Sequence, residues 1–284
     1  MILVTGAAGK TGLAILAALK QQGVKTRAFV KDDEQILSVR KAGANEVVVG
    51  DLLDADVWRL ATTAVSTIYH IAPNMHPQEV RLGQLMVAAA RAIGNCRVVY
   101  HSVIHPQIRE MPHHFSKLKV ENVLFNSGLS YTVLQPTAYM QNLLAYLPSI
   151  QNEGVLPVPY PAKTRLSLVD LQDVATVAAK ILTEPGHEYA TYELVGNRPM
   201  SQTAVADTFS HILQRPVEVR PVSIDAWEAQ ARAKGTDEFT IETAVSMFTY
   251  YAQSGMAGNP HQLRYLLGQN PTSLADFIKR TTSG

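Results

Sequence analysis

The first twelve residues constrain the fold of this chain more than any other segment. An apolar run over residues 2–4 is typical of a buried strand, and a helical apolar pattern follows over residues 13–19. Gly6, Gly9 and Gly12 lie between them. Gly6 can make a tight turn, Gly9 can let phosphates approach the backbone, and Gly12 can let the helix pack closely on the strand. The spacing therefore predicts a strand, a glycine turn and a helix whose N-terminus faces a diphosphate.

The tripeptide Gly9-Lys10-Thr11 also resembles the end of the phosphate-binding loop of nucleotide triphosphatases. The first glycine of that loop would fall at Val4, inside the expected strand, which argues against a triphosphatase. Glycines between an apolar strand and a long helix favour a dinucleotide instead. We expect this turn to contact it through Gly6, Ala8, Gly9, Lys10, Thr11 and Gly12.

The composition limits the kinds of molecule that this chain is expected to bind. The chain has 284 residues, with 25 Lys and Arg against 24 Asp and Glu, so its net charge is +1. No overall field favours nucleic acid or an anionic membrane, so a small-molecule substrate is the better expectation. The single cysteine, Cys96, cannot form an internal disulfide, and no apolar run approaches the roughly 20 residues of a membrane helix. We expect a cytoplasmic protein that binds neither membrane nor nucleic acid, and a homo-oligomer is possible.

Strands and helices alternate over the first half of the chain. Further apolar strands are expected at residues 24–30, 46–50, 65–71, 97–102 and 131–134. Helical patterns separate most of them, and such repeated units predict an α/β fold with a right-handed, doubly wound parallel sheet.

The composition shifts at about residue 139, where the sheet pattern gives way to a proline-rich crossover over residues 154–161 and to later helices. We expect residues 1–138 to form the core, completed by a strand near residues 190–196. Residues 139–284 are expected to form mainly a smaller α+β substrate-binding domain, interleaved with the core.

Ligands of such folds bind at the carboxyl ends of the strands, so residues just past each strand are candidates. Lys31 ends the second strand, and Arg27 lies further back. A basic residue there favours the 2′-phosphate of NADP(H), whereas NAD(H) usually meets an acid. We expect NADP(H), with Lys31 as the first candidate and Arg27 as the second. NAD(H) is possible if Lys31 is only a solvated lysine.

Two further strand ends offer ligand contacts. Asp51 and Leu52 follow the third strand, where Asp51 either bonds the adenine amino group or caps the next helix. The fourth strand ends in Ile71-Ala72-Pro73, and a proline there must turn the chain over the expected cofactor edge. Met75 and His76 follow in the same loop and are candidates to line a substrate site.

Four histidines occur within fourteen residues that begin at the end of the fifth strand: His101, His105, His113 and His114. Zinc sites need ligands that converge from rigid positions, usually with Cys, Asp or Glu among them. Pro106 and Pro112 interrupt this segment and its only acid is Glu110, so we expect no metal site.

Several short motifs follow one another in a characteristic order. They are Gly6 to Gly12, Gly50-Asp51-Leu52, Lys117-x-x-x-Glu121, Ser127 to Pro136, Tyr139 to Asn142, Ser167 to Val174 and Ala190 to Gly196. In this order and spacing the chain resembles the NmrA-like branch of the atypical short-chain dehydrogenases. The resemblance covers most of the chain and implies an NAD(P)-binding Rossmann domain with a small C-terminal domain. Further cofactor contacts are expected from Ile71, Ala72, Pro73, His101, Lys117 and Pro136.

One position departs from the parent superfamily. Active short-chain dehydrogenases carry Tyr-x-x-x-Lys, in which the lysine lowers the pKa of the tyrosine and holds the nicotinamide ribose. His113 stands four residues before Lys117, so the usual proton donor is absent. Lys117 can still bind the ribose, and His113 either donates a proton or only caps the helix. Ser102 either orients a substrate oxygen or only bonds backbone. These three are the candidate catalytic residues.

The resembling branch contains NADPH-dependent reductases of quinones and triphenylmethane dyes, and redox-sensing regulators that bind the dinucleotide without turnover. Our first expectation is an NAD(P)H-dependent reductase that transfers hydride to an electron-poor quinone, dye, enone or imine. Substrate contacts are expected from Met75, His76, Tyr139, Asn142 and Phe248. The alternative is a non-catalytic NADP(H)-binding sensor, and a weaker one is a sugar-nucleotide epimerase or dehydratase.

Overall fold

The computed structural model describes residues 1–282, which form two compact units. Unit 1 comprises residues 1–107, 113–135 and 174–192. Unit 2 comprises residues 108–112, 136–173 and the chain from residue 193 onward. Each unit is described separately.

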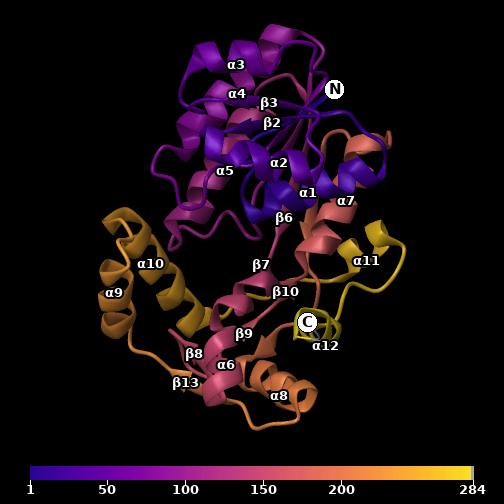
Figure 1. Ribbon diagram of the computed structural model, residues 1–284. Helices are drawn as coiled ribbons and strands as arrows, with labels where there is room; N and C mark the ends of the chain where they lie inside the picture. The colour runs from indigo at the N-terminus through magenta and orange to yellow at the C-terminus, as the bar shows by residue number, and fades with distance from the viewer. Residues whose placement is uncertain (283–284) are drawn as a thin grey trace. The chain divides into compact units, whose positions relative to one another are not determined.

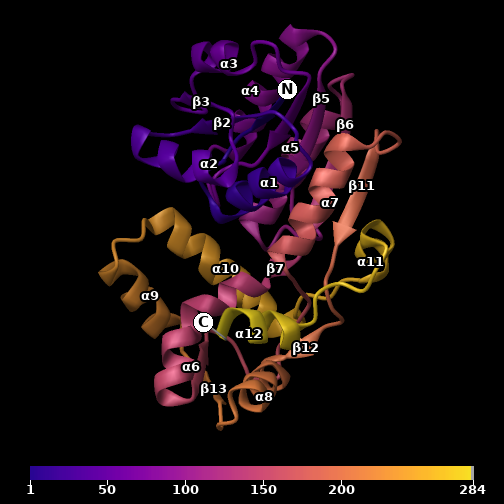
Figure 2. The ribbon, with the colours of Figure 1, turned by 45° about the vertical axis from the view of Figure 1, so that its right-hand side comes forward.

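Unit 1 is built on a seven-stranded sheet in the order β11-β6-β5-β4-β1-β2-β3 (Figures 1 and 2). The five neighbouring pairs from β6 to β3 are all parallel. The strands are β1 (Ile2–Val4), β2 (Thr26–Val30), β3 (Glu46–Val49), β4 (Thr67–His70), β5 (Arg97–His101), β6 (Ser130–Pro136) and β11 (Ala190–Leu194). This confirms the predicted doubly wound α/β fold.

The strand order reverses between β1 and β4, because the chain runs from β1 outward to β3 and then returns to place β4 on the other side of β1. The carboxyl ends of the strands at such a reversal form the ligand-binding crevice of doubly wound sheets. The glycine turn follows β1 and the loop of residues 71–78 follows β4, so the fold brings these two segments to that position.

Helices cover both faces of the sheet. They are α1 (Lys10–Gln21), α2 (Ile36–Ala42, after a 3₁₀ turn at Asp33–Gln35), α3 (Ala55–Ala61), α4 (Glu79–Ile93), α5 (Pro112–Phe125) and α7 (Leu171–Thr183). Figures 1 and 2 both draw α1, α2 and α7 on one side of the sheet. Side chains of α3, α4 and α5, among them Trp58, Met86 and Leu124, share one buried cluster with sheet residues such as Leu3 and Val98.

Helix α5 buries a partly polar face. His114 and Glu121 are buried beside Val120 and Leu124, whereas Phe125 is 40% exposed. The apolar pattern of this helix is a poor guide because two of its inward positions hold ionisable side chains that are hydrogen-bonded inside unit 1.

Unit 2 combines short strand pairs with helices. Its strands pair as β7 (Ala138–Tyr139) with β10 (Leu168–Val169), β8 (Val155–Val158) with β13 (Glu218–Pro221), and β9 (Arg165–Leu166) with β12 (Met200–Ser201). Its helical segments are η2 (Met140–Tyr146), α6 (Leu147–Glu153), α8 (Gln202–Leu213), α9 (Ile224–Ala233), α10 (Glu238–Ser254), α11 (His261–Leu267) and α12 (Leu274–Thr282). A buried cluster that includes Leu156, Phe209 and Phe277 packs them together.

The last helix, α12, is fixed to unit 2 through a buried acid. The Arg280 guanidinium donates to Asp170 Oδ2 at 2.6 Å, and the Gln141 amide donates to Asp170 Oδ1 at 2.7 Å. Asp170 is fully buried, so these charge-assisted bonds replace the water that it loses. Within residues 1–282, no helix is both long and apolar enough to cross a membrane.

Candidate active site

The glycine turn after β1 contains two glycines that the fold itself requires. Gly6 has φ +56°, and a Cβ there would lie 2.7 Å from the Ile71 carbonyl oxygen. A Cβ on Gly12 would lie 2.4 Å from the Gly6 carbonyl oxygen, because α1 packs directly on the turn. Neither position can hold a side chain without moving backbone.

Gly9 is different, because little of the protein fills the space beside it. Its φ of −71° suits any residue, and a Cβ there would meet only the Gly6 carbonyl oxygen, at 3.4 Å. Gly9 is also the N-cap of α1; in the described structure no side chain caps it, and the first helical turn carries no acid. A helix N-terminus of this kind attracts anions, so the turn fits the diphosphate of a dinucleotide.

Thr5 joins the glycine turn to the loop after β4. Its hydroxyl Oγ1 accepts a hydrogen bond from the Ile71 amide at 2.9 Å, and it lies 3.1 Å from the Ile71 carbonyl oxygen and 2.9 Å from His70 Nδ1. The fully buried Thr5 therefore sets how Ile71, Ala72 and Pro73 lie beside Gly6. Thr5 was not predicted as a site residue, although its place between the strand and the first glycine was a signal.

Two basic residues of β2 lie at opposite ends of the strand. The Lys31 side chain is exposed just past the carboxyl end, where its backbone N–H donates to Gln35 Oε1 at 3.0 Å. Arg27 is near the amino end: it donates to Glu46 Oε2 at 2.5 and 2.8 Å, and to the carbonyl of Ala61 at 2.7 Å. This corrects the expectation for Arg27, whose guanidinium is held at the wrong edge of the sheet for a 2′-phosphate.

The turn after β3 is held by its own side chains. Asp51 Oδ1 accepts a bond from the Leu53 amide at 2.9 Å, and the Leu52 carbonyl accepts one from the Trp58 indole at 2.8 Å. The N-cap of α3 is Asp54, which accepts from the Asp56 amide at 2.8 Å. The suggested helix-capping role of Asp51 is therefore filled by Asp54. Asp51 and Leu52 stay predictions as adenine contacts.

Lys117 forms a buried ion pair. Its Nζ donates to Glu79 Oε1 at 2.7 Å, and the Tyr100 hydroxyl donates to the same oxygen at 3.0 Å. The Lys117 side chain is 13% exposed and that of Glu79 is 2% exposed. Lys117 was predicted from its motif, whereas Glu79, which lies 38 residues earlier, was not.

Ser102 is also engaged inside unit 1. Its hydroxyl donates to Glu121 Oε1, and the Gln135 amide donates to the same carboxylate at 2.9 and 3.2 Å. Burial raises the pKa of Glu121, which these bonds partly offset. Since the Ser102 proton is directed at Glu121 and Ser102 is buried, Ser102 does not suit the expected role of orienting a substrate oxygen.

The histidines near Lys117 are neutral. Burial, and then the charge of Lys117, lower the pKa of His101 to about 3, and its Nδ1 lies 2.7 Å from the Tyr69 hydroxyl. Burial, and then His114 and Lys117, lower the pKa of His113 to about 3. An imidazole with such a pKa is neutral near neutral pH and is a weak general acid. This pKa argues against His113 as a strong proton donor, and its role in catalysis stays a prediction.

Histidines also fail to converge on a common point. The His113 and His114 rings meet edge to face with centroids 4.5 Å apart, and His114 Nδ1 lies 3.4 Å from the His105 carbonyl oxygen. In the described part of the chain, no group of three or more His, Cys, Asp or Glu side chains is arranged to hold a metal ion.

The loop after β4 leads directly to Glu79. Met75 has φ +49°, and the neighbouring His76 accepts a bond at Nδ1 from the Gln78 amide at 3.1 Å. The carbonyl of His76 accepts a bond from the Glu79 amide at 3.2 Å, at the start of α4. Met75 and His76 thus belong to the same edge of unit 1 as the glycine turn.

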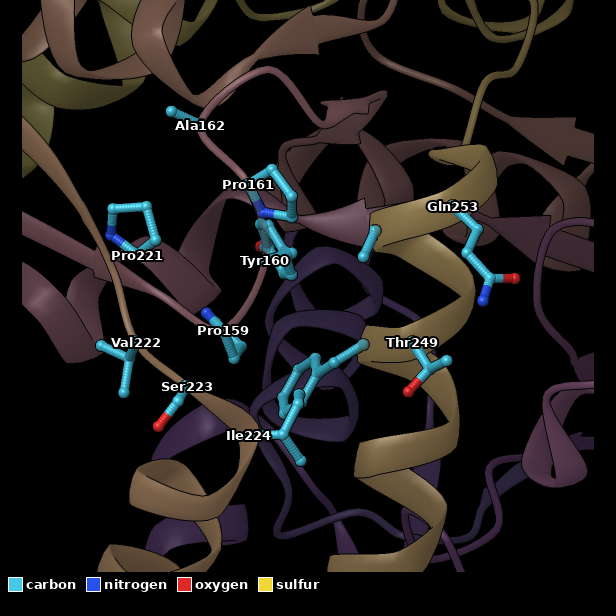
Figure 3. A pocket seen from close by; sticks show the side chains of 12 residues that line it. Pro159, Tyr160, Pro161, Ala162, Pro221, Val222, Ser223, Ile224, Thr249 and Gln253 are labelled. Atoms are coloured by element: carbon cyan, nitrogen blue, oxygen red, sulfur yellow. The ribbon is translucent and has the colours of Figure 1, made fainter.

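The remaining expected contact residues lie in unit 2. Pro136 is the last residue of β6, Tyr139 pairs with Val169 in the β7–β10 ladder, and Asn142 lies in η2. Phe248 lies on α10 and lines an open pocket of about 570 Å³ (Figure 3). The pocket residues are Pro159, Tyr160, Pro161, Ala162, Pro221, Val222, Ser223, Ile224, Phe248, Thr249, Ala252 and Gln253.

Two aromatic residues, Tyr160 and Phe248, line this pocket together with three prolines. Figure 3 shows Tyr160 beside Pro159 and Pro161 on one segment, and Pro221 and Ile224 on another. The Phe248 ring lies 6.2 Å from the Tyr160 ring and 4.8 Å from the Trp227 ring, measured between centroids. No residue that lines the pocket carries a formal charge at neutral pH. Its chemistry therefore suits an uncharged, flat molecule.

Residues 1–278 match the NmrA-like family. The chain belongs to this family. The match confirms the resemblance inferred from the order of the short motifs.

Several known proteins are similar to this NmrA-like chain. An NAD(P)H azoreductase from Xenophilus azovorans is 26% identical over 284 residues, which cover 98% of this chain and 97% of the relative. The structure of an NADPH-dependent quinone oxidoreductase from Escherichia coli, complexed with NADPH, has a TM-score of 0.86 at 23% identity, covering 99% of each chain. That of Citrobacter sp. triphenylmethane reductase with NADP(H) has a TM-score of 0.86 at 24% identity, again covering 99% of each chain. At these identities the solved structures support the fold of the NmrA-like chain.

Proposed function

We propose that this NmrA-like protein is an NAD(P)H-dependent reductase that transfers hydride to a small electron-poor acceptor. The observation that carries the proposal is the glycine turn, which lies where the strand order reverses. Within this turn, Gly9 has open space beside it and is the N-cap of α1, which no side chain caps in the described structure. Relatives support the same reading, because the full-length match from Xenophilus azovorans is named an NAD(P)H azoreductase. The matched Escherichia coli relative is named quinone oxidoreductase 2.

In this proposal each group of expected contact residues binds a different part of the cofactor. The turn from Gly6 to Gly12 binds the diphosphate through main-chain N–H groups and the helix dipole. Lys31 binds the 2′-phosphate and so favours NADP(H), and Lys117 binds the nicotinamide ribose. Ala8, Asp51, Leu52, His101, the loop of residues 71–73 and Pro136 complete the expected contacts. When bound, the reduced nicotinamide supplies the hydride.

The neutral histidines favour acceptors that need little help from an acid. Burial lowers the pKa of His113 to about 3, so its imidazole is neutral and only a weak acid at neutral pH, and the Ser102 hydroxyl is directed at Glu121. A quinone, conjugated dye or enone accepts hydride without prior protonation by the protein, whereas a simple ketone benefits from a general acid. We therefore favour electron-poor conjugated acceptors, bound with contacts from Met75, His76, Tyr139, Asn142 and Phe248.

The test is to mix the purified protein with NADPH and a panel of quinones, dyes and enones, and to follow the near-ultraviolet absorbance of the reduced cofactor. The proposal predicts oxidation of NADPH well above that of a Lys117→Ala variant. Tight NADPH binding without oxidation by any acceptor would contradict a reductase and would favour the non-catalytic sensor. A cytoplasmic location and a homo-oligomer stay predictions.

A further inference from the structure

We propose that Glu79 is a positioning residue that orients the Lys117 ammonium and supplies its counter-charge. This inference rests on the proposed function, in which Lys117 binds the nicotinamide ribose. The Lys117 Nζ lies 2.7 Å from Glu79 Oε1, and both side chains are largely buried. A short, charge-assisted bond of this kind fixes the direction of the lysine side chain.

Glu79 is held in place by the backbone around it. It is the first residue of α4, which begins directly after the loop that follows β4. Its amide donates to the His76 carbonyl at 3.2 Å, and a carboxylate in the first turn of a helix is stabilised by the helix dipole. Because α4 follows a strand of the parallel sheet, this acid lies at the carboxyl edge, where the cofactor is expected.

Tyr100 fixes the carboxylate from a second side. Its hydroxyl donates to Glu79 Oε1 at 3.0 Å, and its fully buried ring stacks on His70 with centroids 5.9 Å apart. The Lys117 Nζ lies 5.7 Å from the centre of the same ring. Strands β4 and β5 therefore hold Tyr100, Tyr100 holds Glu79, and Glu79 holds Lys117.

This arrangement replaces the local pair found in the parent superfamily. There, a tyrosine one turn earlier on the same helix partners the lysine; here that position is His113, which is neutral. Burial, and then the charge of Glu79, raise the pKa of Tyr100 well above its usual value, so Tyr100 keeps its proton. Tyr100 is thus a donor to Glu79 and not a substitute for the missing tyrosine.

The charged and titratable groups around Lys117 show why Glu79 is needed as its counter-charge. Burial, and to a smaller extent the charge of Lys117, lowers the pKa of His70, His101, His113 and His114. Burial raises the pKa of Glu121, and the same lysine charge opposes that rise. Four neutral imidazoles offer no opposite charge, and Glu121 already accepts bonds from Ser102 and Gln135. Among the described residues, Lys117 forms its ion pair with Glu79. Removal of that negative charge leaves the buried ammonium without a counter-charge.

The test compares two matched substitutions in unit 1, Glu79→Gln and Glu46→Gln. Both remove an acid from an ion pair, but Glu46 partners Arg27 at the amino edge of the sheet. Glutamine at position 79 keeps the volume and an oxygen that Tyr100 can bond. A third variant, Glu79→Asp, keeps the charge but retracts it by one methylene, and serves if Glu79→Gln does not fold.

Three measurements separate positioning from a general structural role. The first is the Kd for NADP⁺ by calorimetry. The second compares the change in KM for NADPH with the change in kcat, and the third is the NMR chemical shift of the Lys117 Cε group in cofactor-free protein. We expect Glu79→Gln, or Glu79→Asp in its place, to weaken NADP⁺ binding about tenfold, to raise KM more than it lowers kcat, and to move the Lys117 signal. Glu46→Gln should change the Kd less than about twofold and leave that signal in place.

The inference is overturned if Glu79→Gln and Glu79→Asp bind NADP⁺ like the unmodified protein while Lys117→Ala binds it weakly. In that outcome the ribose contact of Lys117 stands and only the role of Glu79 fails. If Lys117→Ala itself binds NADP⁺ normally, the ribose assignment fails and Glu79 has nothing to position. If the unmodified protein does not bind NADP⁺ at all, the proposed function fails.

Discussion

A Cβ on Gly12 would lie 2.4 Å from the Gly6 carbonyl oxygen, so α1 and the glycine turn touch backbone to backbone. Gly12→Ala should therefore force α1 away from the turn and lower the free energy of unfolding by about 1–3 kcal/mol. Gly9→Ala is the matched control, because a Cβ there meets only one oxygen, at 3.4 Å. Chemical denaturation of both variants checks this. Equal stability of Gly12→Ala and the unmodified protein would contradict the packing.

Lys31→Ala should change the choice between the two nicotinamide cofactors. Loss of the exposed ammonium past β2 removes the charged partner of the 2′-phosphate, so NADP⁺ should bind about tenfold more weakly. Affinity for NAD⁺ should not change, because NAD⁺ lacks that phosphate. Titration of both cofactors measures this. Lys25→Ala, just before β2 at the other end of the strand, is the control, and an equal loss in both variants would argue against Lys31.

Phe248→Ala should weaken binding of the acceptor without changing binding of the cofactor. The ring lines the open pocket of unit 2, and an aromatic pair contributes about 0.5–1.5 kcal/mol beyond burial, so KM for a flat acceptor should rise about threefold to tenfold. The Kd for NADPH should stay unchanged. Phe239→Ala, on the same helix but 40% exposed and outside the pocket, is the control. A KM that does not respond to Phe248→Ala would place the acceptor elsewhere.

Buried histidines should make the protein sensitive to mild acid. Burial lowers the pKa of His70 to about 3, whereas the unfolded chain binds that proton near pH 6.5. Between these values the unfolded state binds more protons, so the free energy of unfolding should fall as the pH falls from about 6.5 towards 4. His70→Gln should show a shallower fall than the unmodified protein. The exposed His211→Gln should show the same fall, and denaturation curves at several pH values decide between these results.

Local patterns predicted the central sheet well. The strand, glycine turn and helix at the N-terminus form as expected. Strand β8 was expected only as part of a proline-rich crossover. It forms because Val155 pairs with Glu218 and Val158 with Pro221, contacts more than sixty residues apart that a local pattern does not reveal.

The candidate site was harder to predict than the fold because burial decides its chemistry. Lys117 was found from its motif, but its partner Glu79 looks like an ordinary acid at the start of a helix. His113 was expected to donate a proton because its usual pKa is near neutrality, and desolvation removes that property. Arg27 was expected near a phosphate, but the register that places it opposite Glu46 directs it to structural bonds.

The central claim is that the turn after β1 binds the diphosphate of a nicotinamide cofactor, and Gly9 tests it most directly. Gly9→Ala keeps an allowed φ and meets no backbone closer than 3.4 Å, so it should fold and lose only the small stability expected when alanine replaces glycine at an N-cap. Calorimetric titration with NADP⁺ should show saturable binding to the unmodified protein and affinity lower by at least about tenfold for Gly9→Ala. Equal affinity of the two proteins, or no binding to either, would contradict the account.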